Sequence, residues 1–332
     1  TTVSNALDSQ PLASPVTERR ADFPALDQQV NACPLVYLDS AASSQVPASV
    51  IDEIARYQRE DHANVHRGVH TLSHRATEVY ENARNAVRRF INADQRREVI
   101  FTRGTTDAIN LVAQSFARPR LQPGNNIVIT HLEHHSNIVP WQLVCEQTGA
   151  ELRVADIDMH GQVDTEQLVK MLDKSTRLLA IAHVSNALGT VLPVSDLVEA
   201  AHERDIPVLV DGAQAVPHMA VNVQELDADF YAFSSHKMFG PTGIGVLYGK
   251  EKWLDAMPPT ALHMSVLSIG EIRKGVERLD RGRKKERLRL WLEQVLIGWL
   301  EDRILPVDHS VADRWGRLLA AAGRPLAAID SR

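Results

Sequence analysis

One lysine of this sequence has neighbours that suit covalent chemistry at its amine. Lys237 lies in the run Ser-Ser-His-Lys-Met-Phe-Gly-Pro-Thr-Gly, which begins at Ser234 and ends in a glycine-rich turn. A lysine amine condenses with an aldehyde, and desolvation makes it a usable nucleophile because it lowers the pKa. Most lysines are solvated surface charges, but this setting predicts a Schiff base between Lys237 and pyridoxal phosphate (PLP).

A buried carboxylate is expected upstream of that lysine. The segment Val208-Leu-Val-Asp-Gly-Ala-Gln-Ala215 is an apolar run ending in Asp211, which predicts a buried parallel strand with a carboxylate at its carboxyl end. Open α/β sheets bind ligands at that edge, and a carboxylate there can keep a pyridine nitrogen protonated. Alone, Asp211 could equally be a helix cap or a turn residue. The Ser-His-Lys segment downstream favours the PLP interpretation.

The elements that would position these residues alternate between strands and helices. Strands are expected over 35–38, 98–103, 126–130, 151–155, 178–183, 208–210, 230–234 and 245–248. Helices are expected over 50–59, 77–91, 105–117, 137–148, 164–172 and 194–204. This alternation predicts an α/β fold with a mostly parallel sheet and helices on both faces.

Seven motifs follow one another within residues 20–258. They are Tyr37-Leu-Asp-Ser-Ala-Ala42, Asn64-Val-His-Arg-Gly68, Arg103-Gly-Thr-Thr106, Glu133-His-His135 with Asn137-Ile-Val-Pro-Trp141, His183-Val-Ser-Asn186, Asp211-Gly-Ala-Gln214 and Ser234-Ser-His-Lys237. In type and order this set resembles the class V aminotransferase superfamily of fold-type I PLP enzymes. Within it, the set is most similar to group II cysteine desulfurases, which are selenocysteine lyase-like. The resemblance implies the large domain of PLP-dependent transferase fold type I.

The resemblance also implies which residues would surround the cofactor ring. Lys237 would carry PLP, and Asp211 would pair with the pyridinium nitrogen. Gln214 and Asn186 would reach the phenolic oxygen. His134 would stack on the ring as a second catalytic group, because an imidazole is a flat partner and a possible proton relay. Taken alone, His134 could be a surface-loop histidine.

The cofactor phosphate needs hydrogen-bond donors. Thr105 and Thr106 follow Gly104 at an expected helix start, where free backbone N–H groups bind anions. By resemblance, Ser234 and His236 would be the other donors. As an isolated motif, Gly-Thr-Thr could be a purely structural helix cap.

The family reaction converts L-cysteine to L-alanine and leaves the sulfur as an enzyme persulfide. The resemblance implies a homodimer, a possible sulfur-acceptor protein and a role in sulfur metabolism or iron–sulfur cluster assembly, and it places His66 and Arg67 in a substrate loop. Selenocysteine or cysteine sulfinate stays open as the substrate. The family's attacking cysteine follows the PLP lysine, and neither Cys33 nor Cys145 matches it. Its arginine for the substrate carboxylate has no counterpart either. We therefore expect impaired turnover, with a non-catalytic remnant as the alternative.

Two groups of histidines could bind a metal ion, although we expect no metal. The first recurs every four residues, which on a helix would form one face: His62, His66, His70 and His74. Gly68 and its β-branched neighbours weaken a helix there. The second group has no nearby cluster of Cys or carboxylates: His131, His134 and His135.

The composition changes after Met257-Pro-Pro259. From residue 264, helices are expected over 266–279, 284–302 and 310–322, with a short strand over 304–307. Four segments resemble a fragment of a PIN-domain toxin nuclease: Ser265 to Gly275, Arg303 to Asp308, Val311 to Gly316 and Arg324 to Asp330. Such nucleases bind Mg²⁺ or Mn²⁺ with clustered acids, of which Glu271 and Asp330 match two. A metal-dependent ribonuclease is thus a third function hypothesis.

The domain organisation expected is a loose leader (1–19), an incomplete desulfurase-like domain (20–258), a junction (259–263) and a mostly helical PIN-like fragment (264–332), fused from two incomplete genes. The formal net charge of −6 argues against nucleic-acid or membrane affinity. No apolar run approaches roughly 18 residues, and the leader does not resemble a signal peptide. With two cysteines among 332 residues, we expect a cytoplasmic protein.

Overall fold

The computed structural model describes residues 19–66, 70–256, 264–265, 273, 276–277, 282–297 and 304–305. The chain divides into two compact units, Thr1–Ala256 and Met257–Arg332. Every residue expected to contact PLP belongs to the first unit.

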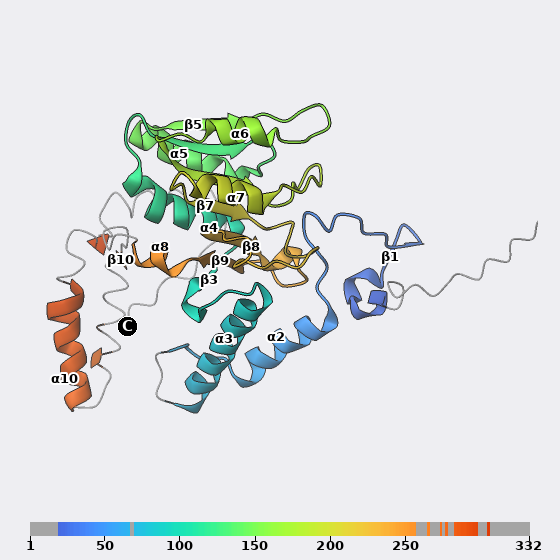
Figure 1. Cartoon of the computed structure of the whole chain (residues 1–332). Helices are drawn as coiled ribbons and strands as arrows, with labels where there is room; N and C mark the ends of the chain where they lie inside the picture. The colour runs from blue at the N-terminus through green and yellow to red at the C-terminus, as the bar shows by residue number, and fades with distance from the viewer. Residues whose placement is uncertain are drawn as a thin grey trace, which may run out of the picture. The chain divides into compact units, whose positions relative to one another are not determined.

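A seven-stranded sheet forms the centre of the first unit (Figure 1). Its strands are β3 (Val99–Thr102), β4 (Asn126–Thr130), β5 (Glu151–Ala155), β6 (Thr176–Ala182), β7 (Val208–Asp211), β8 (Phe230–Ser234) and β9 (Gly245–Gly249). The order across the sheet is β3-β9-β8-β7-β6-β4-β5. Only β9 runs against the other six strands, because it pairs antiparallel with both β3 and β8. The expected mostly parallel sheet is confirmed.

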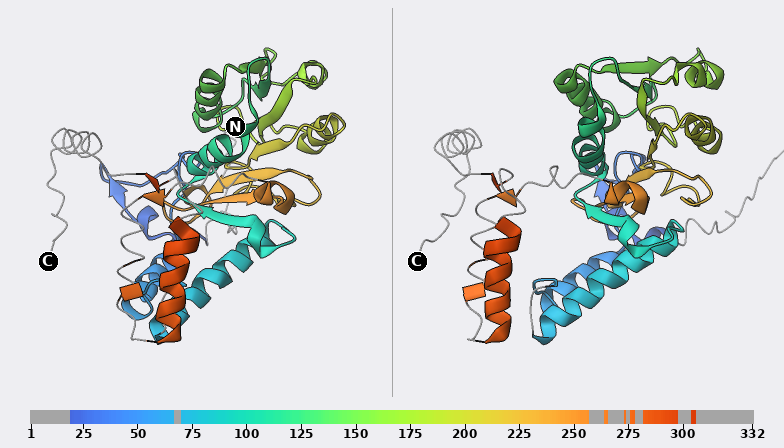
Figure 2. Two further views of the ribbon diagram at one scale, coloured as in Figure 1. Left: turned by 90° about the vertical axis from the view of Figure 1, so that its left-hand side faces the viewer. Right: turned by 60° about the vertical axis from the view of Figure 1, so that its left-hand side comes forward.

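Helices cover both faces of this sheet (Figure 2). α4 (Thr105–Val112) and α5 (Val139–Thr148) lie on one side, whereas α6 (Thr165–Met171) and α7 (Val194–His202) lie on the other and contact each other. The chain steps outward from β4 to β5 and then back to β6 and β7. Because crossovers between parallel strands are right-handed, steps in opposite directions put their helices on opposite faces.

The central strands are continuous apolar runs, and β4, β7, β8 and β9 are buried along their whole length. Such runs are typical of strands covered on both faces. Fully buried aromatic side chains, among them Trp141, Tyr231 and Phe116, fill the space between the sheet and its helices. This core holds the carboxyl ends of the strands in fixed positions.

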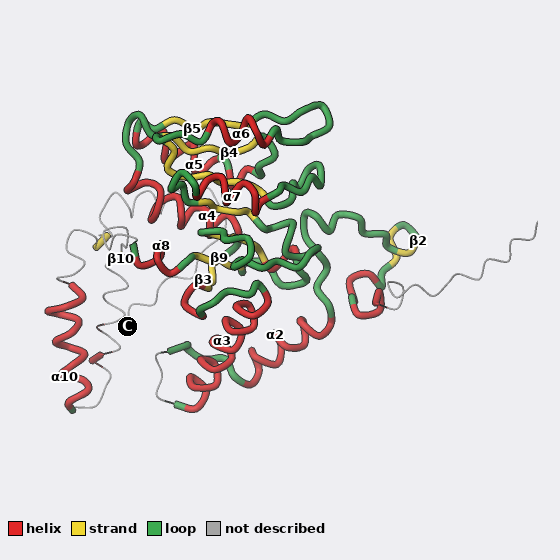
Figure 3. Tube along the Cα trace, in the orientation of Figure 1, coloured by secondary structure: helices red, strands yellow, loops and turns green. Residues whose placement is uncertain are grey.

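The strand expected over 35–38 is wrong. The chain forms a short hairpin just before it, between β1 (Gln29–Val30) and β2 (Cys33–Pro34), and continues as an irregular segment (Figure 3). Val36 is 73% exposed and Leu38 is 91% exposed. An apolar, β-prone sequence forms a strand only where a neighbouring strand accepts its hydrogen bonds, and the described residues offer none here.

The helix expected over 77–91 begins six residues earlier than the sequence indicated. It is α3 (Thr71–Phe90), and His70 caps it by accepting a hydrogen bond at Nδ1 from the Ser73 backbone N–H at 3.3 Å. α3 packs against β3, and the shorter α2 (Ala48–Glu60) precedes it. Histidine is an uncommon capping residue, so the sequence does not reveal this earlier helix start.

The second unit is described in part. β10 (Met264–Ser265) pairs in parallel with β11 (Ile304–Leu305), and α10 (Arg283–Leu290) continues as a π-helical turn over Trp291–Leu296. The helix expected over 310–322 lies outside the described residues, as does most of the helix expected over 266–279. Among the helices described in either unit, none has the length and apolar character needed to cross a membrane.

Candidate active site

A pocket of about 460 Å³ lies at the carboxyl ends of the central strands. Its lining brings together nine residues from five separate segments: Thr105, Thr106, His134, Asn186, Asp211, Gln214, Ser234, His236 and Lys237. These are the nine residues that the sequence assigned to PLP. The crossovers reverse direction between β4 and β6, and such a switch point leaves a crevice at the strand ends.

Lys237 lies at the end of a 3-10 turn (Ser235–Lys237) that directly follows β8. The turn is anchored by Ser44, whose backbone N–H donates to the His236 carbonyl at 2.8 Å and whose Oγ accepts from the Phe239 N–H at 2.7 Å. Burial lowers the pKa of Lys237, and the charge of Asp211 opposes this shift. No hydrogen bond or ion pair holds the Lys237 Nζ within the described residues, so this half-buried amine is free to react.

Asp211 ends β7 between two neighbouring strands and is buried. Its Oδ1 accepts a hydrogen bond from the Ala213 backbone N–H at 2.9 Å, whereas Oδ2 has no partner among the described residues. Burial raises the pKa of this carboxyl, and the bond from Ala213 and the charge of Lys237 act in the opposite direction. A protonated heterocyclic nitrogen in the pocket would be a suitable partner for Oδ2.

His134 lies in the turn that follows β4. Its Nδ1 accepts a hydrogen bond from the Ser136 backbone N–H at 3.2 Å, so a neutral ring carries its proton on Nε2. Burial lowers the pKa of His134, and the nearby Lys237 and His135 lower it further. The ring is therefore a neutral, flat wall of the pocket with an N–H group available at Nε2.

Glu133, beside His134, is a buried carboxyl to which the sequence assigned no role. It accepts hydrogen bonds from Thr130 Oγ1 at 2.7 Å, the Ala182 backbone N–H at 2.9 Å and Asn137 Nδ2 at 2.6 Å. Burial raises its pKa to about 8, although the three hydrogen bonds favour the charged form. The only signal in the sequence was its place in the Glu-His-His motif.

The amino terminus of α4 forms the other end of the site. The Thr105 backbone N–H and Oγ1 both lie 2.7 Å from Ser234 Oγ. A second cavity of about 480 Å³ adjoins this position and is lined by Thr105, Thr106, Ser234, His236 and Gly243, among others. Helix-terminal N–H groups, hydroxyls and an imidazole suit a phosphate group. The chemistry of this donor set and of Lys237 and Asp211 fits PLP.

The segment 39–42 also lines the pocket, through Asp39, Ala41 and Ala42. Gln214 Nε2 donates to the Ala41 carbonyl at 2.7 Å, so this side chain holds the segment in place. The motif over 37–42 is recognisable in the sequence, but none of its residues was expected in the site. The structure shows that the motif supplies a wall of the pocket.

His66, one of the two residues expected in a substrate loop, does not line the pocket. His66 Nε2 lies 3.0 Å from Glu81, its ring contacts Tyr80 edge to face, and it does not line the cavity. Arg67 lies outside the described residues. A substrate role for either residue stays a prediction.

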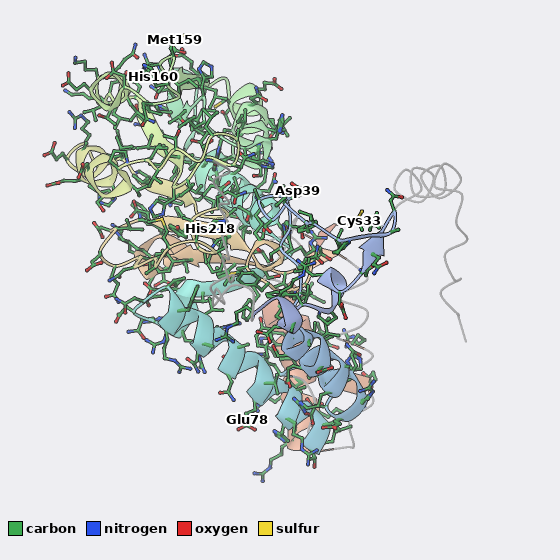
Figure 4. All side chains as sticks on the ribbon, turned by 90° about the vertical axis from the view of Figure 1, so that its right-hand side faces the viewer. Cys33, Asp39, Glu78, Met159, His160 and His218 are labelled. Atoms are coloured by element: carbon green, nitrogen blue, oxygen red, sulfur yellow. The ribbon has the colours of Figure 1, made fainter. Side chains whose placement is uncertain are left out.

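Neither cysteine lines the pocket. Cys33 is exposed on the β1–β2 hairpin, at the periphery of the first unit (Figure 4). Cys145 is buried in α5, and burial raises the pKa of its thiol to about 11. Across the described residues there is no group of three or more His, Cys, Asp or Glu side chains that could hold a metal ion.

Comparison with known proteins identifies the family. Residues 36–270 match the family model described as aminotransferase class-V. A cysteine desulfurase from Enterobacter sp. (strain 638) is 54% identical over 248 residues, which are 75% of this chain and 61% of the relative. The chain thus spans about three fifths of the length of this curated relative. The resemblance of residues 264–332 to PIN-domain nucleases gains no support from these matches and stays a prediction.

Solved structures agree with this assignment. The Escherichia coli cysteine desulfurase CsdA has a TM-score of 0.67 and 36% identity, over 93% of this chain and 78% of that chain. The apo cysteine desulfurase of Thermococcus onnurineus NA1 has a TM-score of 0.69 and 33% identity, over 93% of this chain and 77% of that chain. The family uses PLP. The chain therefore belongs to the aminotransferase class-V family, as a cysteine desulfurase-like member.

Proposed function

We propose that the first unit binds PLP through Lys237 and acts on the sulfur of L-cysteine or a closely related amino acid. The proposal rests on a half-buried amine at Lys237 and a buried carboxyl at Asp211 that line one pocket, with neither Lys237 Nζ nor Asp211 Oδ2 paired among the described residues. When bound, PLP would supply an electron sink for bonds at the α-carbon of an amino acid. A lysine or aspartate with a purely structural role would be expected to have its polar atoms paired with other protein groups.

Each residue of the pocket has a distinct task in this proposal. Lys237 holds the cofactor and moves protons at the α-carbon once its amine is released. Asp211 keeps the ring nitrogen protonated through Oδ2. His134 covers one face of the ring, and its Nε2–H can donate to a substrate. Thr105 and its neighbours Thr106, Ser234 and His236 bind the phosphate, whereas Asn186 and Gln214 lie near the phenolic oxygen.

The chain's own cysteines limit the reaction that we propose. Formation of an enzyme persulfide from L-cysteine requires a cysteine thiolate that reaches the substrate sulfur. Neither Cys33 nor Cys145 lines the pocket. Cys145 is also buried, and a raised thiol pKa opposes thiolate formation. We therefore propose PLP binding with slow release of sulfur.

We also propose that the first unit forms a homodimer. α2 has no buried residue and exposes Ile51 and Ile54, and the segment after the hairpin exposes Val36 and Leu38. Exposed apolar side chains are expected to be covered where they belong to an interaction surface. A sulfur-acceptor protein would be a further partner, and sedimentation of the purified chain tests the homodimer.

A reduction experiment tests the proposal directly. Purified protein mixed with PLP is expected to gain visible absorbance, and borohydride should fix one PLP per chain on the peptide that contains Lys237. Lys237→Ala should lose both signals, whereas Lys250→Ala, outside the pocket, should keep them. An unchanged amount of fixed PLP in Lys237→Ala would refute the assignment.

A further inference from the structure

Three hydrogen bonds join Glu133 to three different parts of the site. Its Oε1 accepts from Thr130 Oγ1, at the end of β4, and from the Ala182 backbone N–H, at the end of β6. Its Oε2 accepts from Asn137 Nδ2, at the end of the 3-10 turn His135–Asn137. Glu133 therefore connects two neighbouring strand ends to the turn that follows His134.

Trp141 fixes the orientation of the Asn137 amide, and with it the direction of the hydrogen bond between Asn137 and Glu133. An indole N–H can only donate, so Asn137 Oδ1 accepts it at 2.9 Å and Asn137 Nδ2 must face Glu133. The Ala182 backbone N–H can only donate as well. Both oxygens of the ionised Glu133 are thus acceptors, and an amide in either orientation would point its NH₂ group at another donor. The network distinguishes a carboxylate from an amide of the same shape.

The same turn holds His134 in place. The Asn137 backbone N–H donates to the His134 carbonyl at 2.7 Å, and the Ser136 N–H donates to His134 Nδ1. Asn137 and Trp141 are both 0% exposed, so no solvent can replace a lost partner of either side chain. The position of the His134 ring in the pocket therefore depends on the bonds that Glu133 accepts.

We propose that Glu133 is a positioning residue, which sets the place of His134 against the cofactor by accepting hydrogen bonds from Ala182 and Asn137. This inference rests on the proposed function, because it assigns Glu133 a part in PLP binding. Glu133 does not line the pocket, so it acts through the groups that donate to it, in the turn after His134 and at Ala182. The alternative is that its network stabilises the fold without affecting the site.

Paired substitutions separate these two roles. Glu133→Gln should weaken PLP binding roughly tenfold, because it leaves two buried donors facing each other, and Asn137→Asp should do the same by facing two acceptors. Glu133→Gln combined with Asn137→Asp should bind within about threefold of the native chain, since the new amide donates to the new carboxylate. The PLP dissociation constant is measured by absorbance titration in alkaline buffer, where Glu133 is ionised. Glu146→Gln is the matched control, since Glu146 lies exposed on α5.

A second cycle tests whether Glu133 acts through His134. In a His134→Ala background, Glu133→Gln should cause no further loss of PLP affinity, although it should still lower the melting temperature of the PLP-free protein. An equal loss in both backgrounds, or native affinity in Glu133→Gln, would overturn the inference. If Glu133→Gln does not fold, the paired variant decides, because its failure to fold or to bind PLP also overturns it. Absence of PLP binding in the native chain would instead refute the proposed function.

Discussion

Glu133 should make the PLP-free protein less stable as the pH rises from 5 to 7. Its carboxyl has a pKa of about 8 in the folded chain, compared with 4.5 in the absence of burial. Between these values the folded state keeps a proton that the unfolded state loses, so the free energy of unfolding falls with increasing pH. The full difference of 3.5 pH units corresponds to at most about 5 kcal/mol, and the part between pH 5 and pH 7 to about 2.5 kcal/mol.

The comparison with Glu133→Gln isolates this contribution. Asp211 has a raised pKa and acts in the same direction, whereas His134, His183 and His236 have pKa values lowered by burial and act in the opposite direction. The histidine contributions are common to both proteins and largely cancel in the difference, whereas the charge of Asp211 also raises the pKa of Glu133 and is part of the contribution that is measured. Urea unfolding followed by circular dichroism at pH 5, 6 and 7 should show the native chain losing about 2.5 kcal/mol relative to the variant. A difference that does not change with pH would refute the reasoning, and Glu146→Gln should show no such trend.

Three further outcomes follow from the geometry of the pocket and its supports. Ser234→Ala should weaken PLP binding several-fold, because it removes the hydroxyl that lies 2.7 Å from Thr105 Oγ1 at the phosphate end; equal affinity in a PLP titration would contradict this role. Gly212→Ala should destabilise the first unit by about 2 kcal/mol or more in urea unfolding, since the added Cβ would lie 2.0 Å from Tyr231 Cε1; Gly282→Ala, whose Cβ meets no atom of the described residues within 4 Å, should be nearly neutral. Sulfide release from L-cysteine with dithiothreitol should stay near the level of free PLP and should not change in Cys33→Ala or Cys145→Ala; a rate that falls in Cys33→Ala would mean that this thiol reaches the substrate.

The parts of the fold that the sequence predicted well are the short apolar strands, whose pattern fits few other structures. The strands over 126–130, 151–155 and 230–234 have the expected bounds. Two of them are buried along their whole length, and short apolar runs of this kind have few alternatives once flanking turns and helices are recognised. The pocket residues could be predicted for a related reason, because Asp211 and Ser234 each end a strand and Thr105 begins a helix. Their positions in the chain place them at one edge of the sheet, and the structure brings them to one cavity.

The parts that the sequence predicted poorly depend on distant partners. Residues 35–38 have the composition of a strand, but pairing requires a neighbour, which no local pattern reveals. The reversal of β9 between β8 and β3 is also a matter of topology rather than composition. At Gly245, an added Cβ would lie 2.4 Å from Gly104 Cα, so this reversed strand packs closely against the loop that begins α4. The phosphate end of the site thus depends on a strand direction that the residues themselves did not show.

Glu133 combines both situations. Its motif was visible, and its neighbour His134 was assigned to the site, but its partners come from the ends of β4 and β6 and from the turn after His134. A buried carboxyl with three donors and no cation beside it among the described residues would be a costly way to stabilise a turn, because its pKa is raised to about 8 even with those three hydrogen bonds. An amide of the same shape cannot satisfy the same donors, since Trp141 fixes the orientation of Asn137. The carboxylate is therefore best explained by what it holds in place, and the cofactor affinity of Glu133→Gln in the presence and absence of His134 decides whether that is the imidazole at the pocket.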